Sequence, residues 1–167
     1  MAPTAQCRNL NRRSPKSGLE RRGGFQTAGM SQKTLSDLSE QMRKIDIAML
    51  STHAENGNIA GRPMSNNGEV EYDGTSYYFT YEDTHTVGEI ERDSKVALAF
   101  MGQNAFSVAV EGQAQLIRDK AQMKDHWSSD LDRWFKDGLD TPGIVMIQVS
   151  ATRVHYWDGE DEGEIKL

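Results

Sequence analysis

The feature that most constrains the fold is a series of short segments rich in apolar and β-branched residues, each bounded by turn-forming residues. Asn56-Gly57 and Asp73-Gly74 are two of these turns, and dipeptides of this kind favour tight connections. Strands joined by tight turns form antiparallel sheets, and closing such a sheet into a barrel removes its exposed edges. About seven strands are predicted, over residues 45–52, 59–65, 76–81, 95–101, 106–117, 143–149 and 153–157.

Helical patterns fall before and between these strands. Leu35, Leu38 and Met42 recur at helical spacing behind Thr34, which forms a capping-box-like pair with Asp37. Further short helices are predicted over residues 84–93, after Asp119 and around Leu131, Trp134 and Phe135. We therefore expect a mainly β domain with peripheral helices. Within it, Pro63 requires its strand to lie at an edge, an end or a bulge.

Charge divides the chain of 167 residues into two parts. Residues 1–30 hold six basic residues and one acidic residue, a net charge of +5, so the rest carries −11 of the overall −6. The basic part has few apolar residues and no periodicity, so we expect it to be disordered and residues 31–167 to form one domain. It is interpreted as an extension upstream of a start at Met30, with an organellar transit peptide or a tail touching nucleic acid or membrane as alternatives.

Composition and spacing argue against several classes of function. The acidic domain lacks the basic face that a nucleic-acid partner requires. No stretch approaches the roughly 18 apolar residues of a membrane span, and the single cysteine, Cys7, permits no intrachain disulfide. We therefore expect a cytoplasmic protein without a membrane partner. No metal site is expected either, because the four histidines are dispersed: His53, His85, His126 and His155.

One group of residues has the composition of an anion-binding site. Residues 61–65 (GRPMS) are predicted on one strand, residues 79–81 end another, and residues 83–87 (DTHTV) open a helix. A helix N-terminus offers unpaired N–H groups, and Arg62 can add a fork of donors to the same phosphate. From these residues alone, ordinary interpretations stay open: Arg62 in a surface ion pair, Thr84 as a plain cap, and the tyrosines as sheet packing.

The chain resembles the FMN-binding split-barrel superfamily, in its general-stress-protein branch related to pyridoxamine 5′-phosphate oxidase. The resemblance covers about residues 31–167 and implies a six- to seven-stranded antiparallel split β-barrel. It further implies a homodimer that binds FMN in two clefts at the dimer interface. It is carried by an ordered set of segments: IDIAMLST, GRPMS, YYFTYEDTHTVGEIERDSKVALAF, FSVAVEGQAQLIRD, HWSSDLDRWFKDG and VHYWDGEDEGEIKL.

The resemblance implies which residues of the GRPMS strand hold the cofactor. Arg62 matches the arginine that meets the FMN phosphate. The backbone that follows matches the segment running along the isoalloxazine ring, which places Pro63, Met64 and Ser65 against the flavin.

Further matches lie on three other segments. Phe79 and Thr80 match a strand-end pair that contacts the ribityl phosphate region, and His85 and Thr86 lie where the family binds the phosphate. Trp157 matches the tryptophan of a terminal Tyr-Trp-Asp motif that approaches the flavin from the partner subunit. The resemblance therefore implies a cofactor site built from both copies of the chain.

Two departures from the family pattern bear on function. Thr86 stands where the family often has lysine, so one fixed positive charge is missing, and we expect lower FMN affinity or tolerance of another flavin such as FAD. After Trp157, true pyridoxamine phosphate oxidases carry a basic Arg-Leu-His-Asp-Arg type segment, whereas residues 158–163 here read DGEDEG. An acidic stretch repels an anionic substrate, so oxidation of pyridoxamine phosphate is disfavoured. Residues 158–164 are interpreted as a solvated end.

The resulting expectation is a homodimeric flavoprotein that supports flavin-dependent redox chemistry in a stress response. No catalytic side chain is assigned, because no acid or base stands out. A flavin-binding or sensing module without turnover is the alternative, and a split barrel that binds haem or a deazaflavin is a third hypothesis. The aromatic residues Trp127, Trp134 and Phe135 are interpreted as core or dimer packing, with a lid over the cleft as the alternative.

Overall fold

The computed structural model describes residues 32–66, 68 and 70–167. The expectations for residues 1–30, disorder among them, lie outside the described residues. No described helix has the length and apolar character of a membrane span. The elements are α1 (Leu35–Met42), β1 (Ile47–His53), β2 (Ile59–Ser65), β3 (Thr75–Tyr81), α2 (His85–Arg92), β4 (Lys95–Met101), β5 (Ser107–Ile117), α3 (Lys120–Lys124), the 3₁₀ helices η1 (Ser129–Arg133) and η2 (Gly138–Asp140), β6 (Ile144–Asp158) and β7 (Asp161–Lys166).

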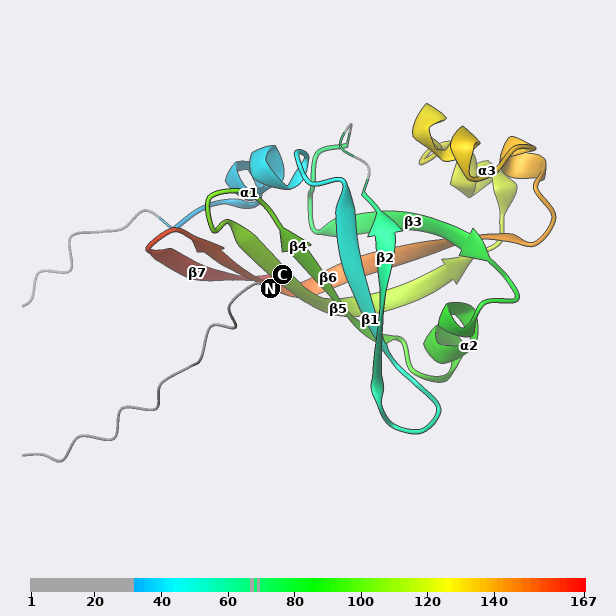
Figure 1. Ribbon diagram of the computed structural model, residues 1–167, viewed down its shortest axis with the longest axis horizontal. Coiled ribbons are helices and arrows are strands. Elements are labelled where there is room, and N and C mark those ends of the chain that lie inside the picture. Colours follow the sequence, from blue (N-terminus) through cyan, green and yellow to red (C-terminus); the bar gives the residue numbers. More distant parts are fainter. Residues whose placement is uncertain (1–31, 67, 69) are drawn as a thin grey trace, which may run out of the picture. The chain divides into compact units, whose positions relative to one another are not determined.

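All seven strands belong to one antiparallel sheet, which confirms the expected mainly β architecture (Figure 1). Six strands follow the order β2-β1-β4-β5-β6-β3, and β7 pairs with the second half of β6. Strands β2 and β3 therefore lie at the two ends of this order. Pro63 lies on β2, which pairs with a single strand, β1. This confirms the edge position that the proline predicted.

The C-terminal part of the sheet differs from the prediction of two strands over residues 143–149 and 153–157. A single strand of 15 residues, β6, spans both. It continues because a β-bulge at Thr152 absorbs a register shift against β5. At the bulge Gly112 is required, since a Cβ there would lie 2.4 Å from the carbonyl oxygen of Ser150.

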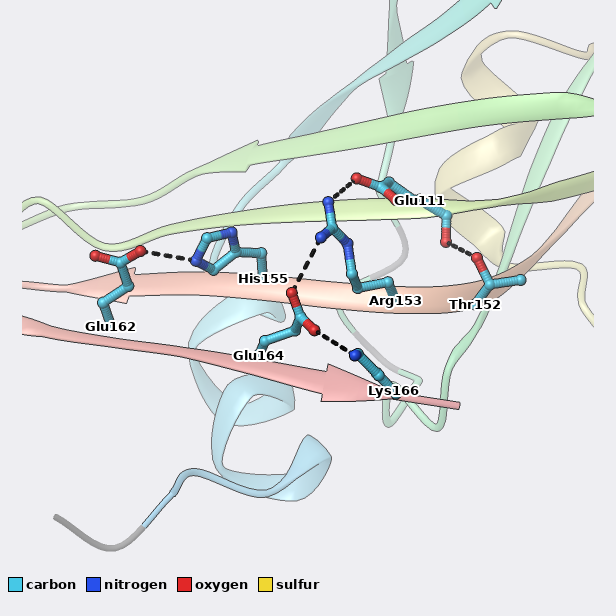
Figure 2. A network of polar contacts seen from close by, with 7 residues as sticks. All are labelled: Glu111, Thr152, Arg153, His155, Glu162, Glu164 and Lys166. Carbon is cyan, nitrogen blue, oxygen red and sulfur yellow. Dashed lines mark hydrogen bonds and ion pairs between the residues drawn. The ribbon is translucent and has the colours of Figure 1, made fainter.

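The acidic segment, residues 158–164, is solvent-accessible as interpreted from its charge, but it is a paired strand rather than a free end. It turns and pairs with β6 as β7, and its alternate side chains meet basic partners across the ladder (Figure 2). Glu164 contacts Arg153 at 3.0 Å, and Glu162 contacts His155 at 3.0 Å. The Arg153–Glu164 ion pair and the His155–Glu162 hydrogen bond join β7 to β6, which explains how so acidic a segment forms a strand.

Buried side chains form two clusters, the first of which we call the main core. It fills the inner face of β1, β4, β5 and β6, where the alternation expected over residues 106–117 is confirmed at Val108 and Val110. Helix α1 adds Leu38 and Met42, and the capping box of Thr34 and Asp37 that starts this helix is present as predicted. Helix α2 adds Ile90.

The second cluster lies at the end of the sheet where α3 approaches β3 and the start of β6 (Figure 1). The predicted cap is present, since the Asp119 side chain accepts from the backbone of Ala121 at 2.7 Å. Helix α3 nevertheless ends at Lys124, and the following helical segments are 3₁₀ turns. The cluster consists of Ile117, Met123, Phe135, Ile144 and Met146, with Tyr77, Phe79, Trp127, Leu131 and Leu139 packed against them.

Candidate functional site

A cavity of about 470 Å³ lies between β2 and β3, the two end strands of the sheet order, and residues 126–135 form its third wall. Pockets for cofactors and small ligands typically measure about 300–1,000 Å³. Another hollow, of about 490 Å³, lies where residues 41–47 meet residues 101–106 and contains none of the predicted site residues. The cavity between β2 and β3 is therefore the candidate site.

Seven of the nine residues predicted to hold the cofactor line this cavity: Arg62, Pro63, Met64, Ser65, Phe79, Thr80 and Thr86. The structure does not bring the other two to it. His85 is exposed on the first turn of α2. Trp157 lies far along β6, 37% exposed, with its ring 4.1 Å from that of His155. Its expected role belongs to a partner subunit, so within one chain it stays a prediction.

Arg62 belongs to a polar triad with Thr52 of β1 and Glu89 of α2. One terminal nitrogen donates to the Thr52 hydroxyl at 2.5 Å, the other donates to Glu89 Oε2 at 2.7 Å, and Thr52 donates to the same carboxylate oxygen at 2.5 Å. Burial by itself raises the pKa of Glu89, but the hydrogen bonds from Thr52 and Arg62 and the positive charge of Arg62 hold it below its usual range. Arg62 is thus ion-paired, but beside the cavity rather than on the open surface.

The start of α2 is the second anion-binding feature of the cavity. Thr84 is the N-cap residue, yet its hydroxyl donates to the carbonyl oxygen of Tyr81 at 2.8 Å and makes no capping bond to the helix. The plain-cap interpretation of Thr84 is therefore wrong. The Val87 N–H donates to the Thr84 carbonyl oxygen at 3.2 Å, but no side chain caps the first turn, so the N–H groups of His85 and Thr86 stay available to an acceptor where Thr84 and Thr86 line the cavity.

An aromatic wall faces β2 across the cavity. Tyr77, Phe79 and Tyr81 alternate along β3, and all three line the cavity. The ring of His126 stacks on Tyr77 with centroids 3.5 Å apart and planes 15° from parallel. Trp134, which the helical spacing predicted to be packed, is 61% exposed at this wall. Sequence reasoning assigned Phe79 to the cofactor site and grouped Tyr81 with it in the candidate anion-binding site, but it missed Tyr77, although the alternation places all three on one face.

Phe135 and Trp127, the other two aromatic residues of the segment 126–135, are packed as interpreted from the sequence. Phe135 is 4% exposed and belongs to the second cluster, while its ring also lies 5.1 Å from that of Tyr81. Trp127 packs against Phe79 edge to face, with ring centroids 5.1 Å apart. Trp127, which does not line the cavity, supports Phe79 in its wall, whereas Phe135 lines the cavity itself.

Polar groups on the same wall were also missed. His126, Ser128 and Asp130 line the cavity, and all three lie in turns or 3₁₀ structure without a regular period. Among the cavity-lining residues Arg62 is the single arginine or lysine, so the positive charge lies at the end nearest α2. Within residues 32–66, 68 and 70–167, no three His, Cys, Asp or Glu side chains gather as they would to hold a metal ion.

Comparison with known proteins places this geometry in a family. The model of the family described as "Pyridoxamine 5'-phosphate oxidase like" matches residues 33–167. General stress protein 26 of Bacillus subtilis is 29% identical over 140 residues, which cover 78% of this chain and 99% of that protein.

Solved structures share the fold. A protein related to general stress protein 26 from Clostridium acetobutylicum superposes with a TM-score of 0.70 at 20% identity, covering 80% of this chain and 94% of that one. The general stress FMN/FAD binding protein of Xanthomonas citri superposes with a TM-score of 0.65 at 20% identity, covering 80% and 95%. The chain therefore belongs to the pyridoxamine 5′-phosphate oxidase-like family, in its general stress protein 26 branch.

Proposed function

We propose that this protein binds a flavin in the cavity between β2 and β3, FMN first and FAD as the alternative, and uses it for redox chemistry during a stress response in the cytoplasm. The observation that carries the proposal is the pairing of an anion-binding end with an aromatic wall in one cavity. The family relationship and the name of the Xanthomonas citri FMN/FAD binding protein support it.

The anion-binding end suits a phosphate group. Arg62 has five N–H donors, of which the triad uses two, so three stay available to a ligand. The uncapped first turn of α2 adds backbone N–H groups and the positive end of the helix dipole. The hydroxyl of Thr80 lies 3.5 Å from that of Thr84 beside this turn and can donate to the same anion, whereas the Thr84 hydroxyl donates to Tyr81. A phosphate is therefore bound by one cation and several neutral donors.

The remainder of the cavity suits a planar ring. Residues 63–65 supply one side from the end strand β2, and Tyr77, Phe79 and Tyr81 supply the other. Flat apolar surfaces on both sides favour a fused aromatic ring system over a flexible ligand. A bound flavin supplies one- or two-electron transfer, while the protein sets its orientation and surroundings. His126 and Asp130 are the side chains placed to hold or exchange a proton at this wall.

The proposal includes a homodimer formed through the outer face of the sheet. Cross-strand partners share a face, and Met49 lies opposite Pro63 on β2 and Ala99 on β4. Exposed apolar side chains extend this patch: Ile47 at 49%, Met49 at 40%, Met101 at 71% and Trp157 at 37%. Ile47 also lines the cavity, so a second copy seated here would border the site and bring its Trp157 toward it. Small residues such as Ala99 and Ala109 permit close approach of two sheets.

Flavin titration tests the cofactor. We expect purified protein to be yellow or to become so with FMN, with saturable binding followed by flavin absorbance. Arg62→Ala is expected to weaken FMN binding by up to a few kcal/mol, the scale of charge-assisted contacts. Arg118→Ala is the matched control, because Arg118 is exposed and pairs with Glu82 and Glu91. Wild-type protein that binds neither FMN nor FAD would refute the proposal.

Two further measurements test the finer parts. Sedimentation should give twice the chain mass, and Met101→Lys should shift it toward one chain, whereas Val70→Lys, at another exposed apolar position, should not. An NAD(P)H oxidation assay on flavin-loaded protein tests turnover. Rates no higher than those of free flavin would favour the sensing module over an oxidoreductase.

A further inference from the structure

Thr52 and Glu89 hold Arg62 by hydrogen bonds but do not line the cavity themselves, whereas Arg62 does. Thr52 is 2% exposed and Glu89 is 8% exposed, so the two partners lie inside the protein fold. Arg62, whose side chain is 20% exposed, therefore connects the cavity to two buried polar partners.

The hydrogen bonds from Arg62 to Thr52 and Glu89 restrict the guanidinium more tightly than one ion pair would. Both terminal nitrogens are bonded, one to a hydroxyl and one to a carboxylate, and the Thr52–Glu89 hydrogen bond ties those two acceptors together. A planar group held at two points has a fixed plane, so its free N–H groups have fixed directions. The cost of removing two charges from water offsets much of their attraction, but losing either partner of such a pair is costly, so the guanidinium keeps this orientation.

We infer that Thr52 and Glu89 are positioning residues that make the geometry of Arg62, and not its charge alone, the basis of selectivity for phosphorylated flavins. This inference rests on the proposed flavin function. The site holds one arginine and no lysine among its lining residues, so it cannot rely on accumulated positive charge to hold a dianion. A correctly oriented Arg62 guanidinium at the start of α2, where no side chain caps the helix, compensates for this shortage of positive charge. Charge-assisted hydrogen bonds to the phosphate are directional, so they are lost when the guanidinium is misaligned.

The test compares FMN with riboflavin, which has the same ring and lacks the phosphate. The measured quantity is the ratio of the two dissociation constants, obtained by titration of the full chain. Two variants change the contacts with Arg62 without changing the net charge. Thr52→Val removes the hydroxyl, and Glu89→Asp shortens the side chain that carries the carboxylate by one methylene. Each is expected to lower the preference for FMN about threefold to tenfold, the effect of losing one such hydrogen bond, with riboflavin affinity unchanged.

Matched controls separate positioning from general damage to the fold. Thr52→Ser keeps the hydroxyl and should keep the wild-type ratio. Thr141→Val changes another buried threonine, and Glu91→Asp changes an exposed carboxylate on the same helix; neither should alter the ratio. Arg62→Lys keeps the charge but loses the fork, and should reduce the ratio about as much as Arg62→Ala does.

The outcomes distinguish this inference from the function beneath it. A wild-type protein that binds FMN and riboflavin equally tightly would refute the phosphate site, and the inference with it. A wild-type preference for FMN that survives Thr52→Val, Glu89→Asp and Arg62→Lys would show that charge alone selects the phosphate, and would overturn the inference while leaving the proposed function intact.

Discussion

The two halves of β6 are buried in different ways. Residues 144–149 are almost entirely buried on both faces, whereas residues 153–158 alternate between buried and accessible positions. The first half separates the main core from the second cluster, since Ile147 faces one and Met146 faces the other. The second half has the main core on one face and the charged ladder of β7 beside it (Figure 2). Burial on both faces thus marks the part of the strand that supports the cavity.

The two clusters are expected to serve different purposes. The main core is built largely from regular strands and helices, and apart from Met64 and Tyr78 its side chains do not line the cavity, so these side chains should determine stability. The second cluster contains aromatic residues from turns and 3₁₀ segments that also line the cavity, so its side chains should affect both stability and ligand affinity. Four predictions test this division, from the largest expected effect to the smallest.

Leu98→Ala should give the largest loss of stability. Leu98 is 1% exposed at the centre of the main core, on a strand paired on both sides. The cavity left there cannot be filled by solvent, so we expect a loss of about 4 kcal/mol in the free energy of unfolding. Urea denaturation measures it. Flavin affinity of the folded variant should match wild type, and a weakened affinity would contradict the division.

Phe135→Ala should lose less stability and more function. Its ring packs in the second cluster beside an open cavity, so solvent can relax part of the void, and we expect a loss of about 3 kcal/mol. Because the ring also supports Tyr81 at the wall, flavin affinity should fall at least severalfold. Titration below the unfolding transition checks this. Unchanged affinity would show that the wall does not depend on the cluster behind it.

Acid should lower the stability of the protein by protonating Glu89, which belongs to the polar triad with Thr52 and Arg62. The folded state holds the pKa of Glu89 below its usual range, so the stability it contributes is present above the unfolded pKa of about 4.3 and lost as pH falls through the lower folded value. Glu89→Gln removes this dependence. Unfolding measured at several pH values should therefore show a shallower acid decline in Glu89→Gln than in wild type. Parallel curves would contradict the assignment.

Ala105→Gly should give the smallest effect, and a favourable one. Asn104 and Ala105 form the centre of the β4–β5 turn with φ of 55° and 62°, a left-handed conformation that suits glycine at the second position. Relief of this strain should raise stability by about 0.5–1 kcal/mol. Thermal unfolding measures it, and flavin affinity should not change. Destabilisation would mean that the alanine methyl group makes a contact worth more than the strain.

Sequence reasoning predicted the regular part of the molecule better than the site wall. The strands of the main core follow a period of two, as over residues 106–117, and Pro63 correctly indicated an end strand. The site residues on β2, β3 and α2 came from a resemblance and from local anion-binding chemistry, and most of them line one cavity. Residues 126–135 could not be placed in this way, because turns and 3₁₀ segments carry no period that separates a buried ring such as Phe135 from an exposed one such as Trp134.

The polar partners of Arg62 could not be predicted from the sequence either, for a different reason. Thr52, Arg62 and Glu89 lie on three separate elements, and the pairing becomes visible only when β1, β2 and α2 are placed together. The β7 strand was missed because its acidic composition outweighed its alternation. The residues that pair with its acidic side chains, Arg153 and His155, lie on β6, about ten residues earlier in the chain.

The bulge at Thr152 has a consequence for insertions and deletions. Before it, Ile147 and Val149 face the main core at odd positions; after it, Val154 and Tyr156 do so at even positions. One additional residue therefore changes the parity of the strand. Deleting Thr152 would give the strand a single parity, with Val154 and Tyr156 still on the face of Ile147 and Val149 and with Arg153 and His155 still outside, so a one-residue deletion at the bulge should be far less harmful than one in a regular strand such as β4.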